Sequence, residues 1–204
     1  MLRGIDLVDE AEQMDIHVRQ GREEFAQAVD FVLEKGLSDF LEIGSFHGGS
    51  AYVFSKALRE RSTVVLVDTC DRKGAREKLE TVAQLIRDRD GHKVTLIVGS
   101  SLDPAVVEQV QAFGITFGLI HIDGSHYTDD VCLDYTHFSP LLRTGGVILF
   151  HDVVVSKMVN AAWKFIEKTA RKGGCKTKVI GGDHWNPSKK DRNFWATGIG
   201  VIEG

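Results

Sequence analysis

Apolar residues along this chain change their spacing repeatedly, between short continuous runs and runs with a spacing near 3.6 residues. Residues 8–35 are polar with helical spacing, and the stretch EEFAQAVDFVLEKG stops at Gly36. After that, β-branched runs such as TVVLVD alternate with amphipathic stretches such as AREKLETVAQLIRD. Short apolar runs bounded by turn residues indicate strands, and the wider spacing indicates helices. Strands that alternate with helices predict a parallel sheet covered on both faces.

The end of the chain breaks this alternation. Strands are expected at DFLEIG, TVVLVD, KVTLIVG, TFGLIHID, GGVILFHD, CKTKVIG and NFWATGIGVIE. Only GGDHWNPSKKDR separates the last two, which is too short for the helix that a parallel crossover normally carries. The strand at 194–202 is therefore expected to run antiparallel, between those at 147–150 and 176–180. The predicted fold class is α/β: a Rossmann-like, seven-stranded, mostly parallel sheet with an antiparallel last strand and helices on both faces.

Composition agrees with one globular domain. The 204 residues are 43% hydrophobic and 26% charged, as is usual for such a domain, here divided into a helical lead-in over 1–35 and a main domain over 36–204. The net charge of −4 provides no basic field for nucleic acid. No apolar run reaches the roughly 18–20 residues of a membrane span. Three scattered cysteines without CxxC indicate reduced thiols, and hence a cytoplasmic location. An amphipathic lead-in helix could serve a homo-oligomer.

The turn after the first strand is the first candidate for ligand binding. In such sheets, ligands lie beyond the carboxyl ends of the strands, near the first one. FLEIGSFHGGS joins a strand to a helix through a glycine-rich turn, but it matches neither GxGxxG nor the P-loop. Without lysine or arginine, this turn suits a nucleoside with a zwitterionic amino-acid tail better than a pyrophosphate, and Glu42 could meet an ammonium through water. Asp68 follows Gly44 by 24 residues, where a carboxylate can accept both ribose hydroxyls. A purely structural turn and a solvent-facing Asp68 are the alternatives.

These features resemble those of a known family. ExGxxxG after the first strand, an acid ending the second and the antiparallel seventh strand look like a class I S-adenosylmethionine-dependent methyltransferase. EIGSFHGGSA together with IDGSHYTDDVCLDYTHFSPLLRTGGVILFHD is similar to a narrower group of small-molecule O-methyltransferases, related to cephalosporin-hydroxylase-type and macrocin-type enzymes. The resemblance covers roughly residues 38–155 and implies S-adenosylmethionine as cofactor. The cofactor-binding residues expected are Glu42, Gly44, Ser45, Gly48, Asp68, Thr69, Ser100, Ser101 and Asp123.

Two carboxylates mark a candidate metal site. Asp123 ends the fourth strand and Asp152 the fifth, so neighbouring strands would place them ~5 Å apart. Such a pair repels unless a proton or a cation intervenes, and oxygen ligands suit Mg²⁺, Mn²⁺ or Ca²⁺. By the resemblance, the metal ligands are Asp123, His151 and Asp152. The relatives usually carry Asp, Glu or Asn where this chain has His151, which favours softer ions. The alternative is that Asp123 only orients cofactor or substrate and Asp152 caps a turn.

His126 is the candidate general base. It lies three residues after Asp123, the offset at which catechol-type relatives carry a catalytic lysine. A histidine with a pKa near 6.5 can take a phenol or alcohol proton at neutral pH; an exposed helix-start residue is the alternative. His121, inside the fourth strand, is expected to be a hydrogen-bonded core residue. The 181–193 loop should lie over the site, or be a surface loop, and its candidate substrate-binding residues are His184, Trp185 and Asn186.

The predicted function is methyl transfer from S-adenosylmethionine to a hydroxyl of a small-molecule acceptor. His126 and Asp123 are the catalytic residues, and a divalent cation assists. Two alternatives stand beside this prediction. One is a metal-dependent hydroxylase or hydrolase that uses the same acids and histidines. The other is an inactive, cofactor-binding partner subunit. The sequence does not name the acceptor, which could be a phenol, a sugar or a natural-product intermediate.

Overall fold

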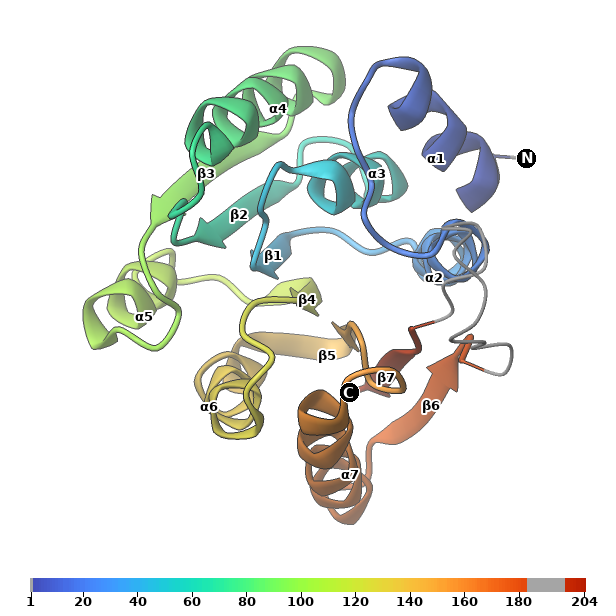
Figure 1. Cartoon of the computed structure of the whole chain (residues 1–204), viewed down its shortest axis with the longest axis vertical. Coiled ribbons are helices and arrows are strands. Elements are labelled where there is room, and N and C mark those ends of the chain that lie inside the picture. Colours follow the sequence, from blue (N-terminus) through green and yellow to red (C-terminus); the bar gives the residue numbers. More distant parts are fainter. Residues whose placement is uncertain (1, 183–196) are drawn as a thin grey trace.

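A twisted sheet forms the centre of the computed structural model, which describes residues 2–182 and 197–204 (Figure 1). Its strand order is β3-β2-β1-β4-β5-β7-β6. β7 pairs antiparallel with β5 and β6, and the other pairs are parallel. The predicted fold class is therefore confirmed. The strands are β1 Phe40–Ile43, β2 Thr63–Asp68, β3 Lys93–Val98, β4 Phe117–Ile122, β5 Leu142–Phe150, β6 Lys176–Ile180 and β7 Ile199–Glu203.

Helices cover both faces of this sheet (Figure 1). One face carries the first four helices and the other carries the last three. Within the described ranges, no helix is long and apolar enough to cross a membrane. The helices are α1 Gly4–Gln13, α2 Arg22–Lys35, α3 Gly49–Ala57, α4 Ala75–Asp90, α5 Pro104–Gln111, α6 Thr128–Phe138 and α7 Lys157–Lys172, with a 3-10 turn at Ser139–Leu141.

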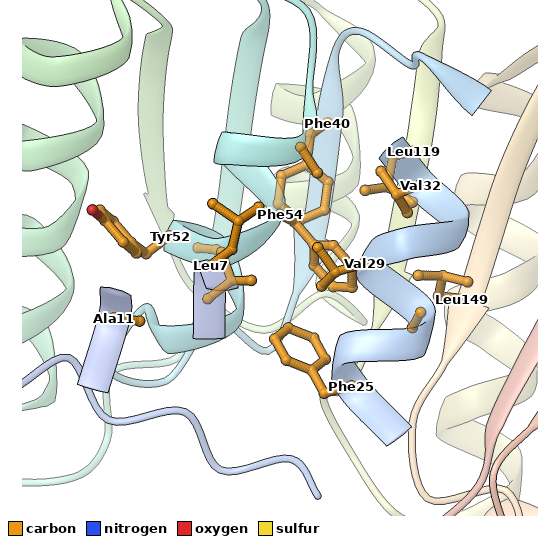
Figure 2. Close-up of a cluster of buried hydrophobic side chains, with 14 of the residues drawn as sticks. Leu7, Ala11, Phe25, Val29, Val32, Phe40, Tyr52, Phe54, Leu119 and Leu149 are labelled. Carbon is orange, nitrogen blue, oxygen red and sulfur yellow. The ribbon is translucent and has the colours of Figure 1, made fainter. Parts of the chain in front are cut away.

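Aromatic residues join the lead-in helices to the sheet. Phe54 of α3 packs edge-on against Phe25 of α2 and Phe40 of β1, with ring centroids 4.9 and 5.7 Å apart (Figure 2). Leu7 of α1 belongs to the same buried cluster. Phe25, Phe40 and Phe54 have no exposed surface, so each contributes roughly 1.5–3 kcal/mol by burial. Besides a polar face, α1 and α2 each have an apolar face that is part of the main core.

The lead-in differs from the single helical stretch expected over 8–35. Two helices form instead, and α1 begins earlier, at Gly4. The break follows Met14, because Asp15 adopts the left-handed conformation with φ of 60° and cannot continue a helix. The chain between the two helices runs over the end of the sheet and places Gln20 at its carboxyl edge.

The last strand also differs from its expected bounds. β7 begins at Ile199 rather than at 194, and 194–196 lie outside the described residues. Thr197 and Gly198 precede the strand. The backbone N–H of Gly198 donates to Glu24 in α2, and the carbonyls of Thr197 and Gly198 accept from the loop after β5. The antiparallel position of this strand between β5 and β6 is nevertheless as predicted.

Candidate active site

A cleft of about 1020 Å³ opens at the carboxyl ends of the parallel strands. Strand order reverses between β1 and β4, so the connections on either side leave this edge uncovered. The predicted residues that the structure brings together around it are Gly44, Ser45, Asp68, Thr69, Ser100, Ser101, Asp123, His126, His151 and Asp152. Because they follow five different strands, one ligand in this cleft could contact several of them at once.

Glu42 and Gly48 lie behind the cleft wall rather than on it. Glu42 has no exposed surface, and its Oε1 lies 2.9 Å from Nδ1 of His121, which confirms His121 as a core residue. Gly48 precedes α3 with a φ of +84°, and a Cβ there would lie 2.8 Å from Cγ1 of Val82 in α4. These two predicted cofactor residues therefore face the packed helices and support the first turn from behind.

The first turn is held in place by Asp68. Its two carboxylate oxygens accept the backbone N–H groups of Phe46 and Cys70, each at 2.7 Å. Gly44 has a φ of +87°, and a Cβ there would lie 2.2 Å from the carbonyl oxygen of Asp123. Only glycine fits this approach. The carboxylate of Asp68 thus fixes the turn. It also lines the cleft, where its remaining lone pairs can accept further hydrogen bonds.

Two arginines from other segments of the chain place positive charge beside the first turn. The guanidinium carbons of Arg19 and Arg72 lie 4.5 and 5.0 Å from the ring centroid of Phe46. Arg19 comes from the α1–α2 connection and Arg72 from the loop after β2, and both line the cleft. The turn itself contains no cation, as its sequence indicated, but the folded cleft supplies two.

Two buried polar atoms at the cleft have no hydrogen-bond partner among the described residues. They are Oε1 of Gln20 and Oγ of Ser45. The other end of the Gln20 amide is fixed, because its Nε2 donates to Oδ2 of Asp123 at 2.9 Å. Leaving a buried acceptor unpaired is costly, so such atoms mark positions that a ligand or water completes. No sequence motif singled out Gln20.

An acid and histidine cluster occupies the other end of the cleft. Donor atoms of Asp123, His126 and Asp152 all lie within 4.8 Å of one another. Nε2 of His126 is 3.2 Å from Oδ2 of Asp152 and 3.9 Å from Oδ1 of Asp123. Asp123, with Asp152 beside it, raises the pKa of His126, although burial opposes this. The strand-end carboxylates therefore meet, as predicted, with His126 at the exposed rim.

His151 lies behind the two carboxylates. Its Nδ1 is 3.3 Å from Oδ1 of Asp123 and 3.3 Å from Oδ1 of Asp152. Burial alone would lower the pKa of His151, but the two acids raise it well above its usual value. Burial would likewise raise the pKa of Asp123, yet the charge of His151 and contacts from both histidines hold it low. The side chain of His126 is thus more exposed to solvent than that of His151, the histidine predicted as a metal ligand.

The candidate substrate residues His184, Trp185 and Asn186 lie outside the described residues. The predictions about the 181–193 loop therefore stay predictions.

Two residues that line or border the cleft near His151 were not predicted from the sequence. Thr197 lines it directly, and Glu24 of α2 lies behind Thr197. Nothing in the local sequence around Glu24 distinguishes it from the other acids of a polar helix.

Comparison with known proteins decides the family. A family model described as a methyltransferase domain matches residues 41–153, more than half of the chain. The chain belongs to this methyltransferase family. Among curated proteins, nothing matches the methyltransferase.

Solved structures share the fold of the methyltransferase. The O-methyltransferase from Bacillus cereus in complex with SAH is 17% identical, with a TM-score of 0.69 over 98% of this chain and 91% of that one. TomG, an O-methyltransferase from Streptomyces achromogenes involved in tomaymycin synthesis, in complex with SAM, is 16% identical, with a TM-score of 0.67 over 100% and 90%. At sequence identities this low, the similarity shows a shared fold and nothing more specific. The family suggested by the sequence motifs is confirmed.

Proposed function

We propose that the protein transfers a methyl group from S-adenosylmethionine (SAM) to a hydroxyl of a small-molecule acceptor, with the help of a divalent cation. The observation that carries this proposal is the arrangement of one cleft. A strand-end carboxylate suited to a ribose lies at one end, and an acid and histidine cluster lies at the other. Membership of the methyltransferase family and the SAM- and SAH-bound structures of the same fold support it.

The lining of the cleft supports an assignment for each part of SAM. We assign the ribose diol to Asp68, which lines the cleft together with Ser100 and Ser101 after β3. The unpartnered Oε1 of Gln20 and Oγ of Ser45 suit the amino-acid tail, whose ammonium donates hydrogen bonds and whose carboxylate accepts them. Arg19 and Arg72 supply the charge that a carboxylate favours.

The acid cluster fits a divalent cation by its donor set. Asp123 and Asp152 offer carboxylate oxygens, and either neighbouring imidazole can add a nitrogen. Carboxylates alone suit Mg²⁺, and the added nitrogen favours Mn²⁺ or another transition ion. A cation bound here would hold the acceptor hydroxyl and lower its pKa.

The chain's own residues then align the reactants and move one proton. His126, exposed at the rim next to Asp152, is placed to take the hydroxyl proton at Nε2. Asp123 connects the two ends of the cleft, since it contacts Gln20 on the cofactor side and His151 on the acceptor side. Most of the rate gain would come from holding acceptor oxygen and methyl group in line and excluding water.

Asp68→Ala should weaken binding of S-adenosylhomocysteine (SAH), the product, by about ten- to a hundredfold. The change removes charge-assisted hydrogen bonds of roughly 1.5–3 kcal/mol and frees the turn at Phe46. Isothermal titration of parent and variant measures this. Glu77→Ala is the matched control, because it removes the same charge from an exposed acid of α4 that does not line the cleft. An Asp68→Ala variant that binds SAH as tightly as the parent would remove the ribose role.

Arg19→Gln should weaken SAH binding by about three- to tenfold, because it removes one cation near the carboxylate of the amino-acid tail. Methylthioadenosine, which lacks that tail, should bind parent and variant equally. Titrating both ligands separates a carboxylate contact from a general change in the cleft. Lys73→Gln serves as the control, since Lys73 does not line the cleft. Equal losses for both ligands would contradict the assignment.

A further inference from the structure

A chain of hydrogen bonds links the lead-in helix α2 to the acid cluster. Oγ1 of Thr197 lies 3.1 Å from Oε1 of Glu24 and 3.0 Å from Nε2 of His151. All three residues are buried, with Glu24 only 4% exposed. On its other side, the His151 ring faces Asp123 and Asp152 through Nδ1. The chain therefore runs from an acid of a peripheral helix to the centre of the proposed acceptor site.

The direction of these bonds follows from what each group can donate. Oε2 of Glu24 accepts the N–H of Gly198 at 2.9 Å, so this carboxylate is used as an acceptor. A hydroxyl has one hydrogen, and Thr197 gives it to Oε1 of Glu24. The hydroxyl oxygen of Thr197 can then only accept a further hydrogen bond. The hydrogen between Thr197 and His151 must therefore belong to Nε2 of the imidazole.

The surroundings of Glu24 leave little room for another arrangement. A Cβ at Gly181 would lie 2.1 Å from Oε2 of Glu24, so backbone is packed directly against the carboxylate. Burial raises the pKa of Glu24, and the bonds from Gly198 and Thr197 and the charge of His151 oppose that rise. The carboxylate thus gains its stabilisation from the same donors that orient Thr197.

We propose that Glu24 and Thr197 are positioning residues that keep a proton on Nε2 of His151 and so turn its Nδ1 toward the cation and acceptor site. This role of Nδ1 rests on the proposed function. When the ring is neutral, Nδ1 offers a lone pair to a cation between the two carboxylates. When it is charged, Nδ1 donates to them instead. In metal sites, such outer partners of a ligating histidine typically change metal affinity by about 10–100-fold.

Thr197→Val is the decisive variant, because it keeps the shape of the side chain and removes only the hydroxyl. A ¹H–¹⁵N spectrum of the imidazole groups, recorded at a pH high enough to make the His151 ring neutral, should show a persistent Nε2–H signal for His151 in the parent, assigned by its loss in His151→Gln. Thr197→Val should shift or lose this signal and weaken Mn²⁺ binding by about 10–100-fold, while SAH affinity changes little. The melting temperature should fall, because Oε1 of Glu24 loses its buried donor. Thr197→Ser should restore both readouts, and Thr136→Val controls for loss of a hydroxyl elsewhere.

Glu24→Gln tests the same series of hydrogen bonds at the end opposite His151. The amide nitrogen can donate to Thr197, which frees the hydroxyl hydrogen to point at Nε2 and favours a proton on Nδ1. Loss of the Nε2–H signal in this variant supports the proposal. An unchanged Nε2–H signal in Thr197→Val, or its absence from the parent, would overturn it. Failure of the parent to bind SAH would instead count against the proposed function, because the Nε2–H signal is read without cofactor or metal.

Discussion

Asp152→Asn should lose both turnover and the response to added metal, with a fall in activity of more than about a hundredfold. The variant keeps the size of the side chain and removes its charge, leaving Asp123 as the only carboxylate of the cluster. Asparagine also tolerates the left-handed backbone at this position, where φ is 60°, so the loop should retain its shape. Raising the pH should not restore activity, because the missing ligand is not replaced by hydroxide.

The measurement is methyl transfer from labelled SAM to a panel of phenols, sugars and other hydroxyl compounds, in chelator and after adding back Mg²⁺ or Mn²⁺. Asp129→Asn is the matched control, since Asp129 is an exposed acid near His126 that does not belong to the cluster. Full activity of the parent in chelator would remove the metal from the mechanism. In that case, Asp152 would act only on His126 and His151.

His126→Ala should lower turnover by about a hundredfold or more and leave the binding of SAH and Mn²⁺ intact. The neighbouring acids raise the pKa of His126, so the ring becomes a neutral base only above its ordinary value near 6.5. The parent rate should therefore rise with pH through a pKa above 6.5. That rise should disappear in the variant, whose remaining rate should grow as hydroxide or direct ionisation of the acceptor replaces the base.

A pH–rate profile of parent, His126→Ala and His126→Lys checks this assignment. Lysine is also a general base but has a higher pKa than histidine, so His126→Lys should recover part of the rate with its rise moved to higher pH. A variant His126→Ala that no longer binds Mn²⁺ would make His126 a metal ligand. An unaltered profile would leave Asp123 as a positioning group without a partner base.

Much of the fold could be predicted because local signals agreed with the tertiary structure. The fully buried runs of β1 and β4 read as central strands, and the short segment after β6 required an antiparallel neighbour. The candidate site followed from the same reasoning. Asp68, Asp123 and Asp152 lie far apart in the sequence, yet each ends a parallel strand, and such ends share one edge of the sheet.

Other residues could not be assigned, because their roles depend on packing between elements. Gln20 and Glu24 come from a polar lead-in whose spacing indicates a helix but not where that helix packs. Glu42 shows the same limit in another way. Its motif indicates a contact with the cofactor, but the buried side chain of Glu42 meets His121 and does not line the cleft. The motif alone does not give the direction of this side chain.

One cleft of the methyltransferase should hold both SAM and a divalent cation. A crystal structure grown with SAH and Mn²⁺, with anomalous data at the manganese edge, shows whether it does. SAH should lie with its ribose hydroxyls on Asp68 and its tail near Gln20, and one anomalous peak should lie between Asp123 and Asp152. SAH bound elsewhere, or a cleft that stays empty at saturating SAH, would contradict the proposed function.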